Sequence, residues 1–325
     1  MKQFLCLALA ALVPLAAGAQ TPSTASGQAF PTRAVRLMVP FPPGGATDIV
    51  GRLVASKMQE VWGQPVVIEN RPGAGTVVGT DYVAKSAPDG YTLGTVVTAY
   101  VINPSLRSDM PYDTLRDLAG VTQVSLQHLV MAAHPSLPAN NIPELIALAK
   151  KEPGKLAYAT PGSGTAMHLS VEMLKTSAGI DLVHVPYKGG APAQQDVISG
   201  RVPILMDVLY VVQPLIRTGK VKVLAVLSPS RAPDSPEYPT VSESVPGVSA
   251  LSLVGVVAPA ATPRDLVHRI GADIARAVKN SDLTERMKQQ GMEPIGSTPE
   301  QFDALIRSEM EKWAKVVKQS GAKAD

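Results

Sequence analysis

Residues 40–48 read Pro40-Phe41-Pro42-Pro43-Gly44-Gly45-Ala46-Thr47-Asp48, and they join two segments with regular apolar patterns. The apolar run before them, Val35 to Val39, predicts a strand, and the apolar spacing after them, Asp48 to Val61, predicts a helix. Glycine lets a ligand approach the backbone closely, and the first N–H groups of a helix lack partners and lie at its positive end. The stretch therefore predicts an anion-binding turn, with a small carboxylate as the first ligand to consider.

A second turn of the same type lies more than a hundred residues further along the chain, at Thr160-Pro161-Gly162-Ser163-Gly164-Thr165. It too follows a predicted strand, 156–159, and precedes a predicted helix, 165–177. Ligands of open α/β sheets bind beyond the carboxyl ends of the strands, and clefts often lie between domains. One turn in each of two lobes, facing across a cleft, would hold a small acid from both sides.

The rest of the chain alternates predicted strands and helices. Short apolar strands separated by helices indicate an α/β fold whose sheets are covered on both faces. Further strands are expected at 66–69, 92–97, 124–133, 182–185, 204–207, 221–227 and 251–258, and further helices at 76–86, 143–150, 191–199, 211–218, 263–280 and 299–319.

The first residues predict export. Lys2, the apolar run Phe4 to Ala17 and the Ala17-Gly18-Ala19 site are typical of a signal peptide, residues 1–19, followed by a flexible leader, residues 20–29. An uncleaved membrane anchor is the alternative. Cys6 is the only cysteine, so the mature chain would have no disulfide, thiolate metal site or cysteine nucleophile. We expect a soluble periplasmic protein.

Charge and motifs argue against several other functions. The chain has 30 Lys and Arg against 27 Asp and Glu, scattered and with few aromatic residues, so nucleic acid is not expected as a partner. The five histidines show no metal-ligand spacing, and we expect no metal, cofactor or catalytic residue. Gly73-Ala74-Gly75 lacks the spacing of a dinucleotide loop, and Ser163 lacks the flanking glycines of a nucleophile elbow.

A series of short motifs in fixed order resembles one known family, the Bug-type periplasmic solute receptors of tripartite tricarboxylate transporters. The resemblance runs from about Phe30 to the C-terminus. After the opening turn, the motifs occur at residues 63–75 (GQPVVIENRPGAG), 88–93 (PDGYTL), 103–104 (NP), 153–156 (PGKL), 184–189 (HVPYKG), 258–263 (APAATP) and 309–314 (EMEKWA).

The resemblance implies a two-lobed periplasmic binding protein fold, type II-like, with an interlobe cleft and a hinge of crossing strands near 124–133 and 251–258. Lobe 1 would comprise 30–125 plus 252–325, and lobe 2 would comprise 126–251. It also implies a monomer that captures a small carboxylate, which could be a di- or tricarboxylate, an aromatic acid or an amino acid, and delivers it to a transporter with large and small permease subunits. A sensory receptor and an exported α/β enzyme remain as alternatives.

In such receptors backbone amides of the two turns hold the ligand carboxylate, which implies contacts at 42–48 and 162–165. The candidate ligand-binding residues are Phe41, Pro43, Gly44, Gly45, Asp48, Tyr100, Gly162, Ser163, Gly164, Thr165, His168, Tyr187 and Asp207. The chain departs from the family at Leu253-Val254-Gly255, where an aromatic residue is common at the first position.

Several of these side chains allow two interpretations. Asp48 could be a first-turn helix acid, or it could pair with an ammonium group of an amino-acid ligand. Ser163 and Thr165 could cap a helix or donate to a carboxylate. His168 is more often packed than ligand-bound at such a position.

The two candidates that follow later strands are equally open. Tyr187 lies in a tight turn and could contact ligand at the cleft edge. Asp207 ends an apolar strand and could face the cleft or cap the next helix. Arg71, by contrast, is expected to stabilise its lobe.

Overall fold

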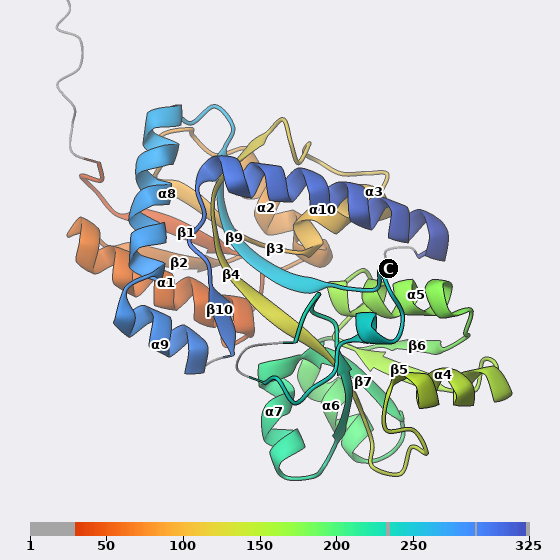
Figure 1. The fold of residues 1–325 in the computed structure, drawn as a ribbon. Helices are drawn as coiled ribbons and strands as arrows, with labels where there is room; N and C mark the ends of the chain where they lie inside the picture. Colours follow the sequence, from red (N-terminus) through yellow and green to blue (C-terminus); the bar gives the residue numbers. More distant parts are fainter. Residues whose placement is uncertain (1–29, 232–234, 290, 323–325) are drawn as a thin grey trace, which may run out of the picture.

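The computed structural model describes residues 30–231, 235–289 and 291–322. The predicted signal peptide and leader, residues 1–29, lie outside this part of the chain. The described chain forms two α/β lobes, one above the other in Figure 1, with two long strands passing between them. This confirms the two-lobed fold expected from the sequence.

The first sheet has the strand order β2-β1-β3-β9-β4. Its strands are β1 (Val35–Val39), β2 (Val66–Asn70), β3 (Thr92–Val97), β9 (Leu251–Pro259) and β4 (Leu118–Ala133), and the short β10 (Met292–Pro294) pairs with β4. β1, β2 and β3 are parallel. Their carboxyl ends therefore meet at one edge, where the first turn begins.

The second sheet has the order β4-β7-β5-β6, with β8 also on β4. Its other strands are β5 (Ala157–Thr160), β6 (Val183–Pro186), β7 (Ile204–Val208) and β8 (Lys222–Val226). β5 is parallel to both β6 and β7. The second turn follows β5, in the middle of that carboxyl edge.

β4 belongs to both sheets and forms the connection between the lobes. Leu118 to His128 pair with β9, and Leu129 to Ala133 pair with β7. The register with β9 shifts twice along the shared length. β9 begins beside the second sheet, since Ala250 N–H donates to Leu227 O at 2.7 Å. The expected crossing strands are therefore present, while the lobe boundaries at 125/126 and 251/252 stay a prediction.

Helices cover both faces of each sheet (Figure 1). They are α1 (Ala46–Trp62), α2 (Val77–Ala84), α3 (Ala99–Leu106), α4 (Ile142–Lys151), α5 (Ala166–Ala178), α6 (Gly190–Ile198), α7 (Leu209–Arg217), α8 (Arg264–Val278), α9 (Ser281–Gln289) and α10 (Pro299–Ser320), with 3-10 turns at Ala74–Thr76 and Val241–Glu243. The packed side chains place α1, α8 and α9 on one face of the first sheet, and α2, α3 and α10 on the other.

The starts of two helices follow from local sequence. Asn141 accepts the N–H of Glu144 at 2.9 Å, and Thr298 forms a capping box with Gln301 ahead of Pro299. Such caps satisfy N–H groups that have no partner inside the helix. In contrast, α3, α9 and β10 were not expected, and α3 proves important for the site.

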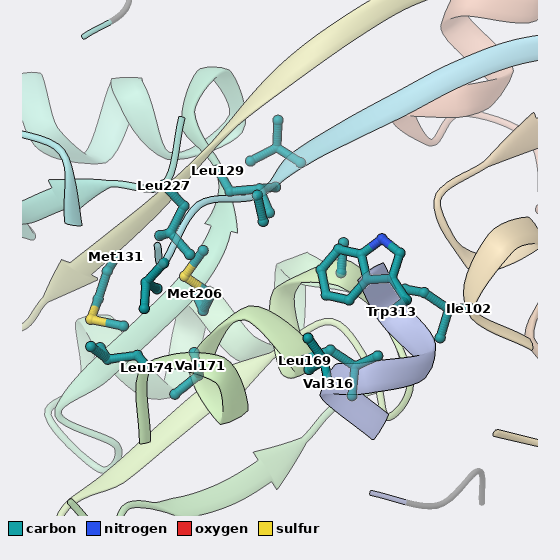
Figure 2. Packing of buried hydrophobic residues seen from close by; sticks show 14 of the residues in the cluster. Ile102, Leu129, Met131, Leu169, Val171, Leu174, Met206, Leu227, Trp313 and Val316 are labelled. Atoms are coloured by element: carbon teal, nitrogen blue, oxygen red, sulfur yellow. The ribbon is translucent and has the colours of Figure 1, made fainter. Parts of the chain in front are cut away.

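The largest apolar cluster extends across both lobes. Trp313 of α10 is fully buried and shares this cluster with Ile102 of α3 and Leu169 of α5. Figure 2 shows these side chains together with Val316. Burying large side chains at this junction stabilises by about 1.5–3 kcal/mol each, so α10 and α3 fix the position of α5 and of the turn that precedes it.

Candidate functional site

The first turn is held in shape by its own aspartate. Gly44 has a left-handed backbone, φ 87°, which glycine adopts without strain. Its N–H donates to Oδ2 of Asp48 at 2.9 Å. Gly45 then serves as the N-cap of α1, with extended backbone angles. The N–H of Gly44 is therefore used within the turn itself, by Asp48.

Asp48 is 1% exposed and both of its carboxylate oxygens have protein partners. Oδ2 also accepts from Nε of Arg52 at 2.8 Å, and Oδ1 accepts from the side-chain amide of Asn70 at 2.9 Å. Burial alone would raise its pKa, but these bonds and the charge of Arg52 lower the pKa below 3.8. Asp48 therefore braces the turn, as the structural interpretation expects, and a contact between Asp48 and an ammonium group of a ligand stays a prediction.

The second turn repeats this construction with a histidine. Gly164 has φ 70°, and its N–H donates to Nδ1 of His168 at 3.1 Å. Thr165 is the N-cap of α5: its hydroxyl accepts the N–H of His168 at 3.2 Å and donates to Gly162 O at 2.9 Å. In each turn the third helical residue accepts the N–H of the glycine that precedes the N-cap. The hydroxyl of Thr165 is thus used as a cap.

Both turns leave backbone N–H groups available to a ligand. Within the described chain, no protein acceptor lies on the N–H of Gly45, Ala46 or Thr47. The same holds for Ser163 and Ala166 in the second turn. These groups lie at the positive ends of α1 and α5, so each turn can accept an anion.

The second turn packs against a helix of the first lobe. A Cβ added to Gly164 would lie 2.7 Å from Cδ1 of Leu106, at the end of α3. Gly164 is buried, whereas Gly44 and Gly45 are exposed. A glycine is therefore required at position 164 both for its backbone angles and for this approach of the two lobes.

A stack of three rings, those of His168, His184 and Tyr158, packs beside the second turn. The His168 ring stacks on that of His184, with centroids 3.9 Å apart, and His184 stacks on Tyr158 at 4.9 Å. Tyr158 donates to Oε1 of Glu172 at 2.6 Å, and the same oxygen accepts from Lys175 at 2.9 Å. His168 is 7% exposed. Its side chain is thus a packed support of the turn.

The hydroxyls of Tyr100 and Tyr187 both donate to acceptors that lie outside the two turns. Tyr100 is 1% exposed and donates to Thr114 O at 2.8 Å, and burial raises its pKa well above 10. Tyr100 is therefore a core residue of α3, and its expected contact with a ligand stays a prediction. Tyr187 donates to Asp196 of α6 at 2.6 Å, and its N–H donates to Thr160 O. Its side chain therefore anchors the loop beside the second turn.

Asp207 lies at the end of β7, beneath the start of α6. It is 3% exposed and accepts the N–H of Val208 at 2.7 Å and the amide of Gln194 at 3.1 Å. A Cβ on Gly190 would meet its Oδ2. Burial raises the pKa of Asp207 to about 6, against the lowering effect of the two hydrogen bonds. Asp207 thus supports α6.

Arg71, in the first lobe, donates from Nε to Oε1 of Glu69 at 2.8 Å, as expected for an arginine that stabilises its lobe.

Two supports of the first turn were missed by the sequence reasoning. Arg52 is four residues after Asp48, a spacing that predicts a helical ion pair. Asn70 ends β2 and also donates to Phe41 O at 2.9 Å. No local signal identifies Asn70, because only the parallel pairing of β1 with β2 brings it to the turn.

The described chain also has surface hollows away from the turns, and four of them are well defined. The largest of these, about 650 Å³, lies on the first lobe and is lined by Arg33, Arg36, Arg71, Lys85, Asp81 and Asp89. Another, about 170 Å³, is lined by Leu253 and Gln123 beside the crossing strands. Among the described residues, no group of three His, Cys, Asp or Glu could hold a metal ion. No helix in residues 30–231, 235–289 or 291–322 combines the length and apolar character needed to cross a bilayer.

Two lobes, crossing strands and a glycine turn at the inner edge of each sheet define a periplasmic binding protein of the two-lobed type. Comparison with known proteins gives the family. Residues 50–322 match the tripartite tricarboxylate transporter family receptor. BugT of Bordetella pertussis is 36% identical over 301 residues, which cover 92% of each chain. The protein therefore belongs to this receptor family, and the expectation that it is a Bug-type receptor and not an enzyme is confirmed.

Solved structures agree with this membership. A protein of R. palustris solved with adipate has a TM-score of 0.83 and 34% identity, covering 90% of this chain and 99% of that one. MatC from Rhodopseudomonas palustris, solved with bound malate, has a TM-score of 0.77 and 30% identity, covering 89% and 100%. Both neighbours were solved with small carboxylates.

Proposed function

We propose that this protein captures a small carboxylate between its two lobes and delivers it to a tripartite tricarboxylate transporter. The ligand class comprises di- and tricarboxylates, aromatic acids and amino acids. The proposal includes an exported, monomeric receptor, a signal peptide at residues 1–19 and a transporter with large and small membrane subunits. The observation that carries it is the matched pair of turns, each with unpartnered N–H groups at a helix start.

The binding free energy that the two helix ends can contribute is too small to account for tight binding of a ligand. A helix end contributes up to about 2 kcal/mol when partly buried. Micromolar binding requires about 8 kcal/mol, so two helix ends cannot supply it alone. Closure of the lobes must exclude water and add direct hydrogen bonds from backbone N–H groups to the carboxylate. Binding then shifts the balance between open and closed forms by its preference for the closed form.

The ligand is best identified on freshly purified protein. We expect mass spectrometry of the released small molecules to detect a carboxylic acid, and a thermal-shift panel of carboxylic acids to raise the melting temperature. Incubation of the bound acid with pure protein should leave it unchanged. Consumption of the acid, or no response to any acid in the panel, would contradict the proposal.

A pair of variants at Gly45 tests the backbone contact itself. Gly45 has φ −81° and ψ 169°, angles that proline and alanine both tolerate. Gly45→Pro removes one N–H from the turn, and we expect a loss of about tenfold in affinity, equal to 1.4 kcal/mol. Gly45→Ala keeps the N–H and meets no atom nearer than 4.0 Å, so it should bind like the wild type. Equal affinities of both variants would argue against a contact at this N–H.

A further inference from the structure

Arg107, near the junction of the lobes, is a cation that pairs with no side chain among the described residues. It follows α3 directly, and its own N–H closes the helix on Asn103 O at 3.0 Å. Its buried Nε has no hydrogen-bond partner among the described residues. Its guanidinium forms no ion pair within 4.0 Å with a carboxylate of that part of the chain. A partly buried arginine is usually paired, because leaving a charged donor unsatisfied away from water costs free energy.

One side of Arg107 faces the loop that follows β2. Its Nη2 would lie 3.9 Å from a Cβ placed on Gly75. This loop has left-handed backbone at Ala74, Gly75 and Thr76, with φ of 46°, 61° and 85°. Asn103 of α3 holds it by donating to Gly75 O at 2.8 Å. Residues at the end of α3 therefore hold this loop and also place the Arg107 guanidinium beside it.

The other side of α3 reaches the second turn, through the approach of Leu106 to Gly164 described above. The loop after β2 begins at the same sheet edge as the first turn, because Asn70 also donates to Phe41 O. The guanidinium of Arg107 therefore lies beside a loop that leaves the carboxyl edge of the first sheet, and the residue before it, Leu106, reaches the turn of the second lobe.

We propose that Arg107 binds a second carboxylate of the ligand, which makes this protein a receptor for dicarboxylates. The inference rests on the proposed function, in which the turns hold the first carboxylate. A guanidinium presents a planar fork of donors that matches a carboxylate and forms short, charge-assisted hydrogen bonds. The alternative is that Arg107 only complements the negative end of α3.

Matched pairs of acids separate these roles. We would measure affinities by titration calorimetry for succinate with butyrate, adipate with hexanoate, and terephthalate with benzoate. The members of each pair share a carbon skeleton and differ by one carboxylate. For at least one pair, we expect the wild type to bind the dicarboxylate 10- to 100-fold more tightly. Arg107→Gln should lose this preference, with affinity for the monocarboxylate within twofold of the wild type.

Two further variants serve as controls. Arg286→Gln removes the same charge from an exposed residue of α9 and should keep the full preference. Arg107→Lys keeps the charge but not the fork, so we expect an intermediate preference. It also provides the comparison if the glutamine variant does not fold.

The outcomes distinguish the two proposals. A wild type that binds both members of every pair equally, or an Arg107→Gln protein that keeps the preference, overturns the role of Arg107 and leaves carboxylate capture intact. A wild type that binds no acid of any pair, and none of a wider panel with citrate and amino acids, overturns capture and this inference together.

Discussion

Asp48 and His168 occupy the same position in two separate turns, the third residue of the helix, and each accepts the N–H of the glycine four residues before it. One acceptor is a buried carboxylate with three protein donors, and the other is a ring nitrogen in a stack of aromatic side chains. The two side chains thus make the same hydrogen bond to a glycine N–H, one with a charged acceptor and one with a ring nitrogen. The stability of the two turns should therefore respond differently to substitution and to pH.

For the second turn, we predict that the hydrogen-bond acceptor at position 168 matters more than the ring. His168→Ala leaves the N–H of Gly164 unsatisfied in a buried turn, which costs about 1–3 kcal/mol of unfolding free energy. His168→Asn places an amide oxygen near the position of Nδ1 and should recover most of that loss, although both variants lose the stack on His184. Urea denaturation checks this, and equal losses in the two variants would show that the hydrogen bond adds nothing.

For the first turn, we predict that Asp48→Asn destabilises the protein by about 2 kcal/mol at pH 7, because charged hydrogen bonds are exchanged for neutral ones in a buried site. The folded pKa of Asp48 is depressed, so its contribution is present above the unfolded value of 3.8 and is lost as pH falls through the folded pKa.

The difference in unfolding free energy between wild type and Asp48→Asn should therefore be constant from pH 8 to pH 5 and shrink below pH 3.8. Denaturant titrations of both proteins across this range give the difference directly. A difference that stays unchanged down to pH 2 would contradict the ion-pair account of the turn.

Sequence reasoning reached as far as local signals allow. The two turns could be predicted, because glycines between a strand and a helix are visible within ten residues. The helix α3 could not be predicted, because it is short and contains Pro104, which is unfavourable inside a helix. Its stability comes from the packing of Tyr100 and Ile102 against α10, which the sequence does not reveal. The burial of Tyr100 could not be predicted for the same reason, since the partner of its hydroxyl, Thr114 O, is brought to it only by the tertiary fold.

At the junction of the lobes, we predict that Gly164→Ala costs clearly more than Gly179→Ala. Both glycines have left-handed backbone, φ 70° and 61°, so alanine costs about 1 kcal/mol at each through the backbone. At Gly179 an added Cβ meets nothing within 4 Å, whereas at Gly164 it would lie 2.7 Å from Leu106. Overpacking adds about 1–3 kcal/mol at Gly164.

The double variant Gly164→Ala/Leu106→Ala isolates this contact. Removing the leucine side chain makes room for the new methyl group, so the two substitutions should be less costly together than the sum of the single changes by about 1 kcal/mol or more. Thermal unfolding of the four proteins completes the cycle. Strict additivity would mean that Leu106 and residue 164 do not press on one another in solution.

In the second lobe, we predict that Asp207→Asn stabilises the protein at neutral pH. Burial raises the folded pKa of Asp207 to about 6 from 3.8, so the folded state binds its proton more tightly than the unfolded state does. Stability from this group is therefore full below pH 3.8 and is lost as pH rises through 6, by up to about 3 kcal/mol. Asparagine keeps an acceptor for Val208 N–H and can pair with Gln194, without the cost of a buried charge.

The unfolding free energy of Asp207→Asn minus that of the wild type should thus grow between pH 4 and pH 6 and level off above pH 7. A difference that is flat over this range, or that falls with rising pH, would show that the carboxylate is already well satisfied as an anion beneath α6.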